Sequence, residues 1–149
     1  MASNKDLQIS TVLEDLAKIK TAKAKKEYLI KNESRQLKTF LKGAFDKSLE
    51  FNLPAGTPPY TPNKDSEYGF GRVSSDFRFF AKGYEGDRLE AGVREGKFIK
   101  VLESVSPEEA ELIVMMKDKK LVGKYKGVTL KLVSDAFPTL ISQWFINQL

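Results

Sequence analysis

The sequence predicts an all-α protein, a single compact domain of six to eight short helices. Two observations support this fold class. Residues that commonly cap helices precede apolar residues at helical spacing, notably at Thr11, Ser34, Ser106 and Thr129. The length of 149 residues lies near the commonest domain size, and a hydrophobic content of 41% is ordinary for one globular core. We therefore expect one helical domain over residues 1–149.

Three helices are predicted in the N-terminal part, over residues 10–46. Each starts after a residue that can accept hydrogen bonds from the free N–H groups of a first helical turn. These residues are Thr11, Thr21 and Ser34. The first helix is expected over residues 11–20, because Thr11 and Glu14 match a capping box. The third, SRQLKTFLKGAF, has apolar residues at i, i+3, i+4, i+7 and i+8, which is typical of an amphipathic helix.

A proline-rich arm is predicted over residues 52–66, between two helical subdomains. It contains four of the six prolines of the chain, which favour extended geometry and exclude a helix. A loop of this length needs anchors in a compact domain. We expect Leu53 and Tyr60 to hold it against the helices. An alternative is that TPPYTP serves as a polyproline ligand, although flanking basic residues are missing.

Further helices are predicted over residues 74–149. Starts are expected near Ser74, Asp87, Ser106, Thr129 and Pro138. Gly92 and Gly96, four residues apart on one of these helices, are expected to allow close helix packing. The last helix would carry Trp144 and Phe145, to which the sequence assigns no role.

Composition excludes several classes of chemistry. The chain has no cysteine and no histidine, which excludes disulfides, thiol nucleophiles, imidazole bases and Cys/His zinc sites. The glutamates near residue 108 are more typical of helix-dipole compensation than of an acid–base pair. We therefore predict a non-enzymatic protein, with no cofactor and no metal. The longest apolar run is short and the first residues show no secretory pattern, so we expect a soluble intracellular protein without a membrane partner.

Positive charge is concentrated in two segments. The net charge is +5, and six lysines face one acid in each of residues 18–31 and 117–131. Basic patches of this kind favour a nucleic-acid partner. The second segment is the preferred site, because a tyrosine between lysines can stack on a base while the ammonium groups contact phosphates. Its candidate residues are Lys117, Lys119, Lys120, Lys124, Tyr125, Lys126 and Lys131. Two alternatives stay open: Tyr125 anchors the turn to the core, and the lysines serve only solubility and helix dipoles.

The stretch YGFGRVSS partly matches an RNA-recognition signature. Gly69, Phe70, Gly71 and Val73 agree with it, whereas Tyr68, Arg72 and Ser75 do not. No strands are predicted around it, so an RNA-recognition fold is rejected.

Residues 102–141, LESVSPEEAELIVMMKDKKLVGKYKGVTLKLVSDAFPTLI, resemble a family of about 150-residue proteins from T4-like tailed bacteriophages, notably marine ones. The strings LKTFLKGAFD and LPAGTPPYTPN also look like that family's. The tail SQWFINQL departs from it. The resemblance implies a phage protein of unknown function in the cytoplasm of an infected bacterium, with presence in the virion a possibility, and it supplies no catalytic residues. Two functions follow: nucleic-acid binding through the lysine patches or, as the alternative, interaction with phage or host proteins during virion assembly.

Overall fold

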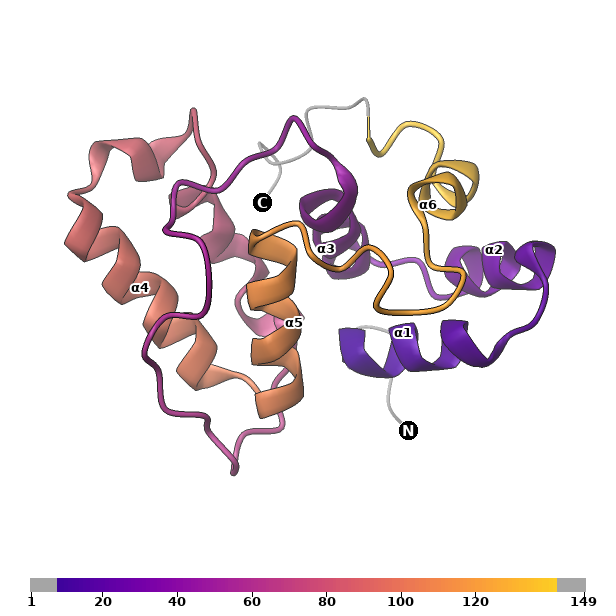
Figure 1. Ribbon diagram of the computed structural model, residues 1–149, viewed down its shortest axis with the longest axis horizontal. Coiled ribbons are helices and arrows are strands. Elements are labelled where there is room, and N and C mark those ends of the chain that lie inside the picture. Colours follow the sequence, from indigo (N-terminus) through magenta and orange to yellow (C-terminus); the bar gives the residue numbers. More distant parts are fainter. Residues whose placement is uncertain (1–7, 142–149) are drawn as a thin grey trace.

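Helices form the regular structure of residues 8–141, the part of the chain that the computed structural model describes (Figure 1). The α-helices are α1 (Ile9–Lys18), α2 (Ala22–Lys31), α3 (Arg35–Phe45), α4 (Ala91–Ser104), α5 (Pro107–Lys117) and α6 (Leu130–Ala136). Three 3-10 helices, η2 (Phe70–Arg72), η3 (Ser74–Phe79) and η4 (Glu85–Arg88), precede α4. Within these residues there is no strand, and only an isolated antiparallel bridge joins Phe51 to Ala81. The prediction of an all-α fold with six to eight helices is confirmed.

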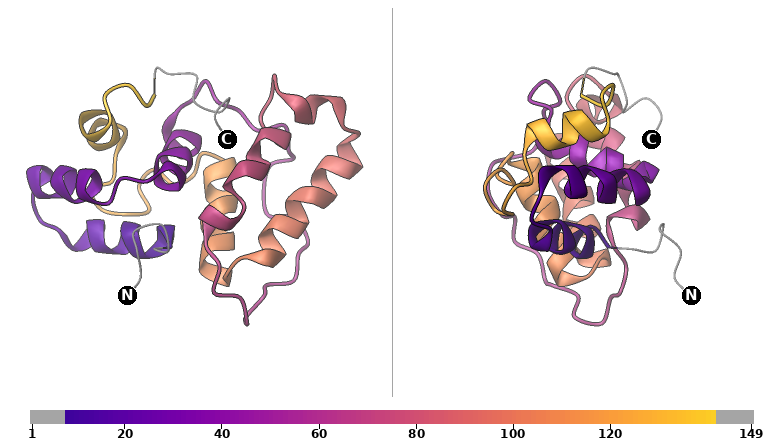
Figure 2. Two further views of the ribbon diagram at one scale, coloured as in Figure 1. Left: turned by 180° about the vertical axis from the view of Figure 1, so that it is seen from behind. Right: turned by 90° about the vertical axis from the view of Figure 1, so that its right-hand side faces the viewer.

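Helix α5 joins the two halves of the chain. It packs against α1 and α3 on one side and α4 on the other, while α2 packs against α6. Figures 1 and 2 show α4 and α5 toward one end of the molecule, α1, α2 and α6 toward the other, and α3 between them. The described chain is therefore a single compact domain in which helices from both halves share one core.

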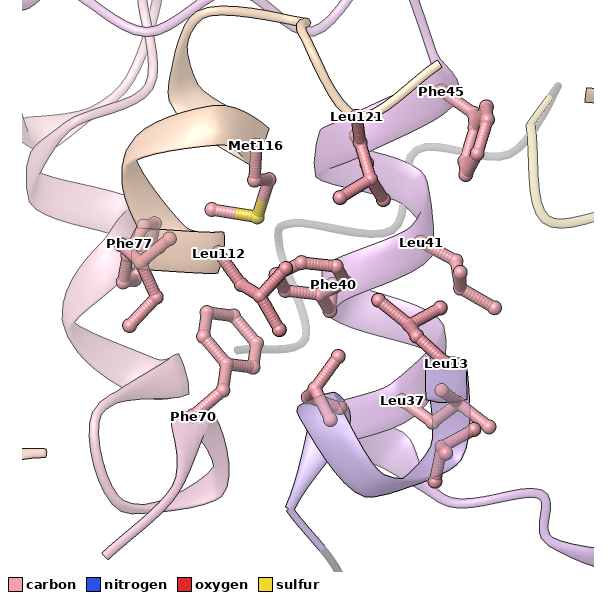
Figure 3. Close-up of a cluster of buried hydrophobic side chains, with 14 of the residues drawn as sticks. Leu13, Leu37, Phe40, Leu41, Phe45, Phe70, Phe77, Leu112, Met116 and Leu121 are labelled. Atoms are coloured by element: carbon pink, nitrogen blue, oxygen red, sulfur yellow. The ribbon is translucent and has the colours of Figure 1, made fainter. Parts of the chain in front are cut away.

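The core is built mainly from leucines and phenylalanines, including those at the helical spacing predicted for α3. Phe40 of α3 lies edge-on to Phe70, with ring centroids 5.4 Å apart, and Leu112 and Met116 of α5 complete this cluster (Figure 3). Phe77 contacts Phe70 at 5.1 Å, also edge-on. Such edge contacts add about 0.5–1.5 kcal/mol each beyond burial. The aromatic side chains of residues 70–80 therefore pack into the same core as the helices.

Three of the predicted helix caps are confirmed. The hydroxyl oxygens of Thr21, Ser34 and Thr129 each accept a hydrogen bond from the backbone N–H three residues later, at 3.1, 3.1 and 3.2 Å. Helix α5 begins at Pro107, as expected, but the Ser106 hydroxyl does not cap it; it donates instead to Gln8 Oε1 at 3.3 Å.

The predicted start of the first helix is wrong. Thr11 lies inside α1, which begins at Ile9 after Gln8. Its cap comes from α5: the buried Glu109 carboxylate accepts hydrogen bonds from the N–H groups of Ile9 at 3.0 Å and Ser10 at 2.7 Å. The same carboxylate accepts from the N–H of Phe70 at 2.9 Å. A distant side chain thus replaces the local capping box.

Residues 74–90 differ from the predicted helices. Residues 74–79 form the 3-10 helix η3 and make no side-chain cap. Asp87 does not start a helix; its carboxylate accepts from the Gly83 N–H and the Asn52 amide at 2.7 and 3.0 Å. The α-helix begins only at Ala91. Short 3-10 turns occur here because buried Phe77 and Phe80 hold the backbone against the core.

Two predictions for the second half of the chain are wrong: the role of Gly92 and Gly96 in helix packing, and the start of a last helix at Pro138. A Cβ atom built on Gly92 or Gly96 would meet nothing within 4 Å, so these glycines do not mediate close helix packing. Residues 138–141 form a turn rather than the start of a helix. The rest of the predicted last helix, with Trp144 and Phe145, lies outside the described residues.

The proline-rich arm is fastened to α4 and α5. Leu53 and Tyr60 pack against the core, as predicted. The Thr61 N–H donates to the Glu103 carboxylate at 2.7 Å, and the Lys117 ammonium donates to the carbonyls of Pro54 and Gly56 at 2.8 and 3.0 Å. Side-chain hydrogen bonds to its backbone therefore hold the arm in place where prolines exclude secondary structure.

Candidate functional site

The two lysine-rich segments meet at one groove. A cavity of about 940 Å³ lies where the end of α1, the first turns of α2, the turn before α6 and α6 itself come together. The lysines that line it come from both segments: Lys18, Lys20, Lys23, Lys25, Lys26, Lys126 and Lys131. We call this cavity the lysine groove. Segments more than 90 residues apart in the sequence thus contribute to a single basic surface.

Most cations of the lysine groove face solvent. All of its lysines except Lys25 are exposed. Among the lining residues, Asp135 is the acidic one, and its carboxylate pairs with the Lys131 ammonium at 3.0 Å on the surface. Exposed pairs of this type contribute little energy, so they release the cation readily. The groove therefore offers an excess of accessible positive charge.

Helix dipoles do not account for the lysines at the start of α2. The first turn of α2 contains no acidic residue, and Lys23 and Lys26 lie in its first turns. Cations at the positive end of a helix are unfavourable by roughly 0.3–1 kcal/mol each. The dipole explanation holds for Lys18 at the end of α1 but not for these residues. The dipole of α2 disfavours these cations, and an anionic ligand would offset that cost.

Lys25 has a structural role. Its side chain is buried, and its ammonium donates to the carbonyl oxygens of Leu16, at 2.5 Å, and of Ile19. These carbonyls lie at the C-terminal end of α1, where the Leu16 carbonyl also accepts from the backbone N–H of Ile19 at 3.1 Å. Lys25 therefore fixes the corner between α1 and α2 and places the neighbouring lysines around the groove.

The predicted site at residues 117–131 is divided by the fold. Lys117 is buried and engaged with the arm and with Asp118, at 2.5 Å. Lys119 adopts a left-handed backbone with φ of 59° and donates to the carbonyls of Gly43 and Asp46 at the end of α3. Burial lowers the pKa of Lys119 to about 8. Lys117 is buried and Lys119 is half-buried, and backbone carbonyl oxygens accept from the ammonium groups of both.

The remaining predicted residues are on the outside. Lys120, Lys124, Lys126 and Lys131 are exposed, and Lys126 and Lys131 line the groove. Tyr125 is half-buried against the core, which agrees with the alternative that it anchors the turn. Burial, followed by the charge of Glu14, raises the pKa of Tyr125. The Lys124 ammonium lies over its ring, 5.6 Å from the centroid.

Sequence reasoning proposed nucleic-acid binding through both lysine patches but named candidate site residues only in the second. Its members Lys18, Lys20, Lys23 and Lys26 line the groove opposite Lys126. Their excess over acids was visible in the sequence, but their proximity to residues 126–131 was not. Within residues 8–141, no three carboxylates converge in a way that could hold a metal ion, and no helix has the length and apolar character required to cross a membrane.

Comparisons with known proteins place the chain in a family without assigning it a role. A family model described as "Family of unknown function (DUF6433)" matches residues 12–123, which include most of the helices and half of the lysine groove. The comparison with curated proteins gives no match.

Proposed function

We propose that this chain, which belongs to the family of unknown function DUF6433, is a non-enzymatic protein that binds nucleic acid through the lysine groove. The observation that carries the proposal is the meeting of two lysine-rich segments at one groove, with a single lining acid among the described residues. Lysines that contact phosphates release condensed counterions, and this release drives sequence-independent binding. The proposed contacts are Lys20, Lys23, Lys26 and Lys126.

The groove supports contacts to the nucleic-acid backbone rather than reading of bases. Lysine ammonium groups are flexible point charges, which suit phosphates but provide little geometric selection. The aromatic residue nearest to the predicted site, Tyr125, is half-buried in the core. We therefore expect binding that depends strongly on salt and weakly on sequence.

We also propose a bacteriophage origin for the protein. The resemblance of residues 102–141 to a family from T4-like tailed bacteriophages supports a phage protein that acts in the cytoplasm of an infected bacterium. Mass spectrometry of purified virions, compared with infected-cell lysate, tests whether the protein also enters the particle.

A salt titration with matched variants tests the binding proposal. The groove variant replaces Lys23, Lys26 and Lys126 with glutamine, and the control variant replaces the exposed Lys47, Lys64 and Lys82. Both lose three charges. For duplex DNA, we expect the wild type to show log affinity falling linearly with log salt, and the groove variant to lose roughly 0.9 of slope per lost contact. Equal losses in the two variants, or no salt-dependent binding by the wild type, contradict the proposal.

A second candidate function is binding of a phage or host protein. Large apolar side chains on elements that border the groove are exposed: Ile30 at 46%, Val122 at 65% and Leu130 at 43%. A mixed basic and apolar surface also suits an acidic protein partner. In that case DNA and RNA would not bind, and a pull-down from infected cells with wild type, but not with an Ile30→Ser, Leu130→Ser variant, would recover a specific protein.

A further inference from the structure

A second basic cavity lies at the other end of the molecule from the lysine groove. It has a volume of about 340 Å³ and lies between the 3-10 helices η2 and η3 and the helix α4. Its walls combine three cations, one acid and apolar residues of the core. This volume falls in the usual range for small-molecule sites. None of its lining residues belongs to the lysine groove.

The cations of this cleft are available to a ligand. Arg72 stacks on exposed Tyr68, with its guanidinium carbon 4.2 Å from the ring centroid. Within residues 8–141 neither Arg72 nor Lys100 forms an ion pair. Stacking fixes the plane of the guanidinium while leaving its N–H donors free, which suits recognition of a phosphate. The segment YGFGR thus contributes an oriented cation rather than an RNA-recognition strand.

An aromatic ring forms part of the same cleft. Phe79 is half-buried, and two cations lie over its ring: the guanidinium carbon of Arg78 is 5.0 Å and the ammonium of Lys97 is 5.3 Å from its centroid. A base that stacks on Phe79 therefore takes the place of the Lys97 ammonium, which is then free to contact the phosphate. Buried Val73, Phe80 and Val101 complete an apolar lining. Aromatic and apolar surfaces beside cations are the arrangement on which nucleobases stack. A simple inorganic anion would leave this apolar lining unused.

One acid makes the cleft selective. Asp76 lines the cavity, and its carboxylate has no hydrogen-bond or ion-pair partner in the described part of the chain. A carboxylate beside three cations disfavours a ligand that carries only negative charge. It favours one that also supplies hydrogen-bond donors, such as the amino groups of a base or the hydroxyls of a sugar.

We propose that the cleft between η3 and α4 binds one nucleotide unit, with the base against Phe79, the phosphate at Arg72, Lys97 and Lys100, and a base or sugar donor at Asp76. The unit is either a free mononucleotide or one residue of a single strand, because both present the same chemistry.

Isothermal titration calorimetry on the full chain tests the proposal. The probes are the four ribonucleoside monophosphates, adenosine, inorganic phosphate and a single-stranded pentanucleotide. We expect at least one monophosphate to bind, and to bind about tenfold or more tightly than adenosine or phosphate alone, because each of these lacks half of the contacts. The two sources are compared in the groove variant, in which Lys23, Lys26 and Lys126 are replaced with glutamine. There, stronger binding of the pentanucleotide, by tenfold or more, identifies a strand as the source, and equal or weaker binding identifies a free nucleotide.

Matched variants separate this cleft from the lysine groove. Arg72→Gln and Lys100→Gln are expected to weaken monophosphate binding about tenfold each, since a charge-assisted contact is lost. Lys126→Gln, in the lysine groove, should leave monophosphate binding unchanged. Asp76→Asn should reduce the ratio of the affinity for a nucleoside monophosphate to the affinity for inorganic phosphate. The proposal is overturned if no monophosphate binds at millimolar concentration, or if Lys126→Gln weakens binding as much as Lys100→Gln does. Neither result bears on the duplex salt titration of the lysine groove.

Discussion

The methylene stem of Lys25 fills the space that a side chain at Gly127 would occupy. A Cβ atom on Gly127 would come within 2.5 Å of Lys25 Cε. The glycine also has a φ of +75°, in the left-handed region. Because the Lys25 ammonium holds the end of α1, this contact connects the turn before α6 with the corner between α1 and α2.

Gly127→Ala is expected to destabilise the protein more than Gly123→Ala does. Gly123 has a similar φ of +87° but open space around it, so its alanine variant measures backbone strain alone, about 1–2 kcal/mol. The additional loss of stability in Gly127→Ala, compared with Gly123→Ala, measures the free-energy cost of displacing the Lys25 side chain. Urea unfolding measures both. Equal losses of stability would show that Lys25 moves aside at no cost.

Gly92→Ala and Gly96→Ala are expected to stabilise the protein. Both glycines lie inside α4 with nothing within 4 Å of an added Cβ, so alanine gains helix propensity of about 0.5–1 kcal/mol at each site. Gly43→Ala in α3 is the contrasting control, because its Cβ would meet the buried Met116 sulfur at 2.8 Å. Melting temperatures should rise for the first two and fall for the third. A fall for either α4 variant contradicts the open environment seen here.

Glu109→Gln is expected to lower the free energy of unfolding by about 2–3 kcal/mol, since hydrogen bonds to a charged acceptor are lost and the amide brings donors toward the N–H groups of α1 and Phe70. The control is Glu108→Gln, one residue earlier on the exposed face of α5. Chemical denaturation should show a clearly lower free energy of unfolding for Glu109→Gln than for Glu108→Gln. Similar stabilities would mean that water can replace the carboxylate cap.

Lys117→Met is expected to loosen the proline-rich arm. The change removes the donor to the carbonyls of Pro54 and Gly56 and leaves Asp118 without its ion-pair partner, although the Asp118 carboxylate still accepts from the Gly56 N–H at 3.0 Å. Trypsin should then cleave after Lys64 faster than in the wild type under native conditions. Lys120→Met, an exposed neighbour, should leave the cleavage rate unchanged. Unaltered cleavage in Lys117→Met would show that the remaining contacts, the packing of Leu53 and Tyr60 and the hydrogen bond from Thr61 to Glu103, hold the arm without Lys117.

Stability should depend on pH through Lys119. Its pKa in the folded protein is about 8, below the usual 10.5, because burial disfavours the charged form. Between pH 8 and 10.5 the unfolded chain therefore binds more protons at this residue, and its contribution to the free energy of unfolding rises with pH. Between pH 7.5 and 9.5 the wild type should gain stability relative to Lys119→Met. A constant difference across this range would show that the folded-state pKa is not lowered.

Local signals predicted most of the fold, and distant contacts account for the errors. Hydroxyl caps such as Thr21 and Ser34 act on the next turn of chain, so sequence spacing reveals them. The cap of α1 comes from Glu109, about one hundred residues away, and the competing Thr11 pattern carried no information about it. The 3-10 turns of residues 74–79 depend on where Phe77 and Phe80 are buried, which is a tertiary effect.

The candidate site was predicted in part for the same reason. The lysine excess of residues 117–131 was evident in the sequence, and the structure places Lys126 and Lys131 on the surface. Lys117 and Lys119 look identical to them in the sequence, yet their ammonium groups bind backbone carbonyls inside the protein. No local pattern distinguishes an internal lysine from a surface one, because the carbonyls that receive it come from the arm and from α3.

The Glu109 cap also sets an order of events during protein synthesis. Ile9 emerges early, but the carboxylate that caps it is added about 100 residues later. At about 5–20 residues per second, the ribosome needs on the order of 5–20 s to supply it. Throughout that interval the amphipathic α1 has neither its cap nor the apolar face of α5. The nascent chain therefore passes through a stage in which its first helix is available to chaperones, and final docking of that helix must follow the translation of α5.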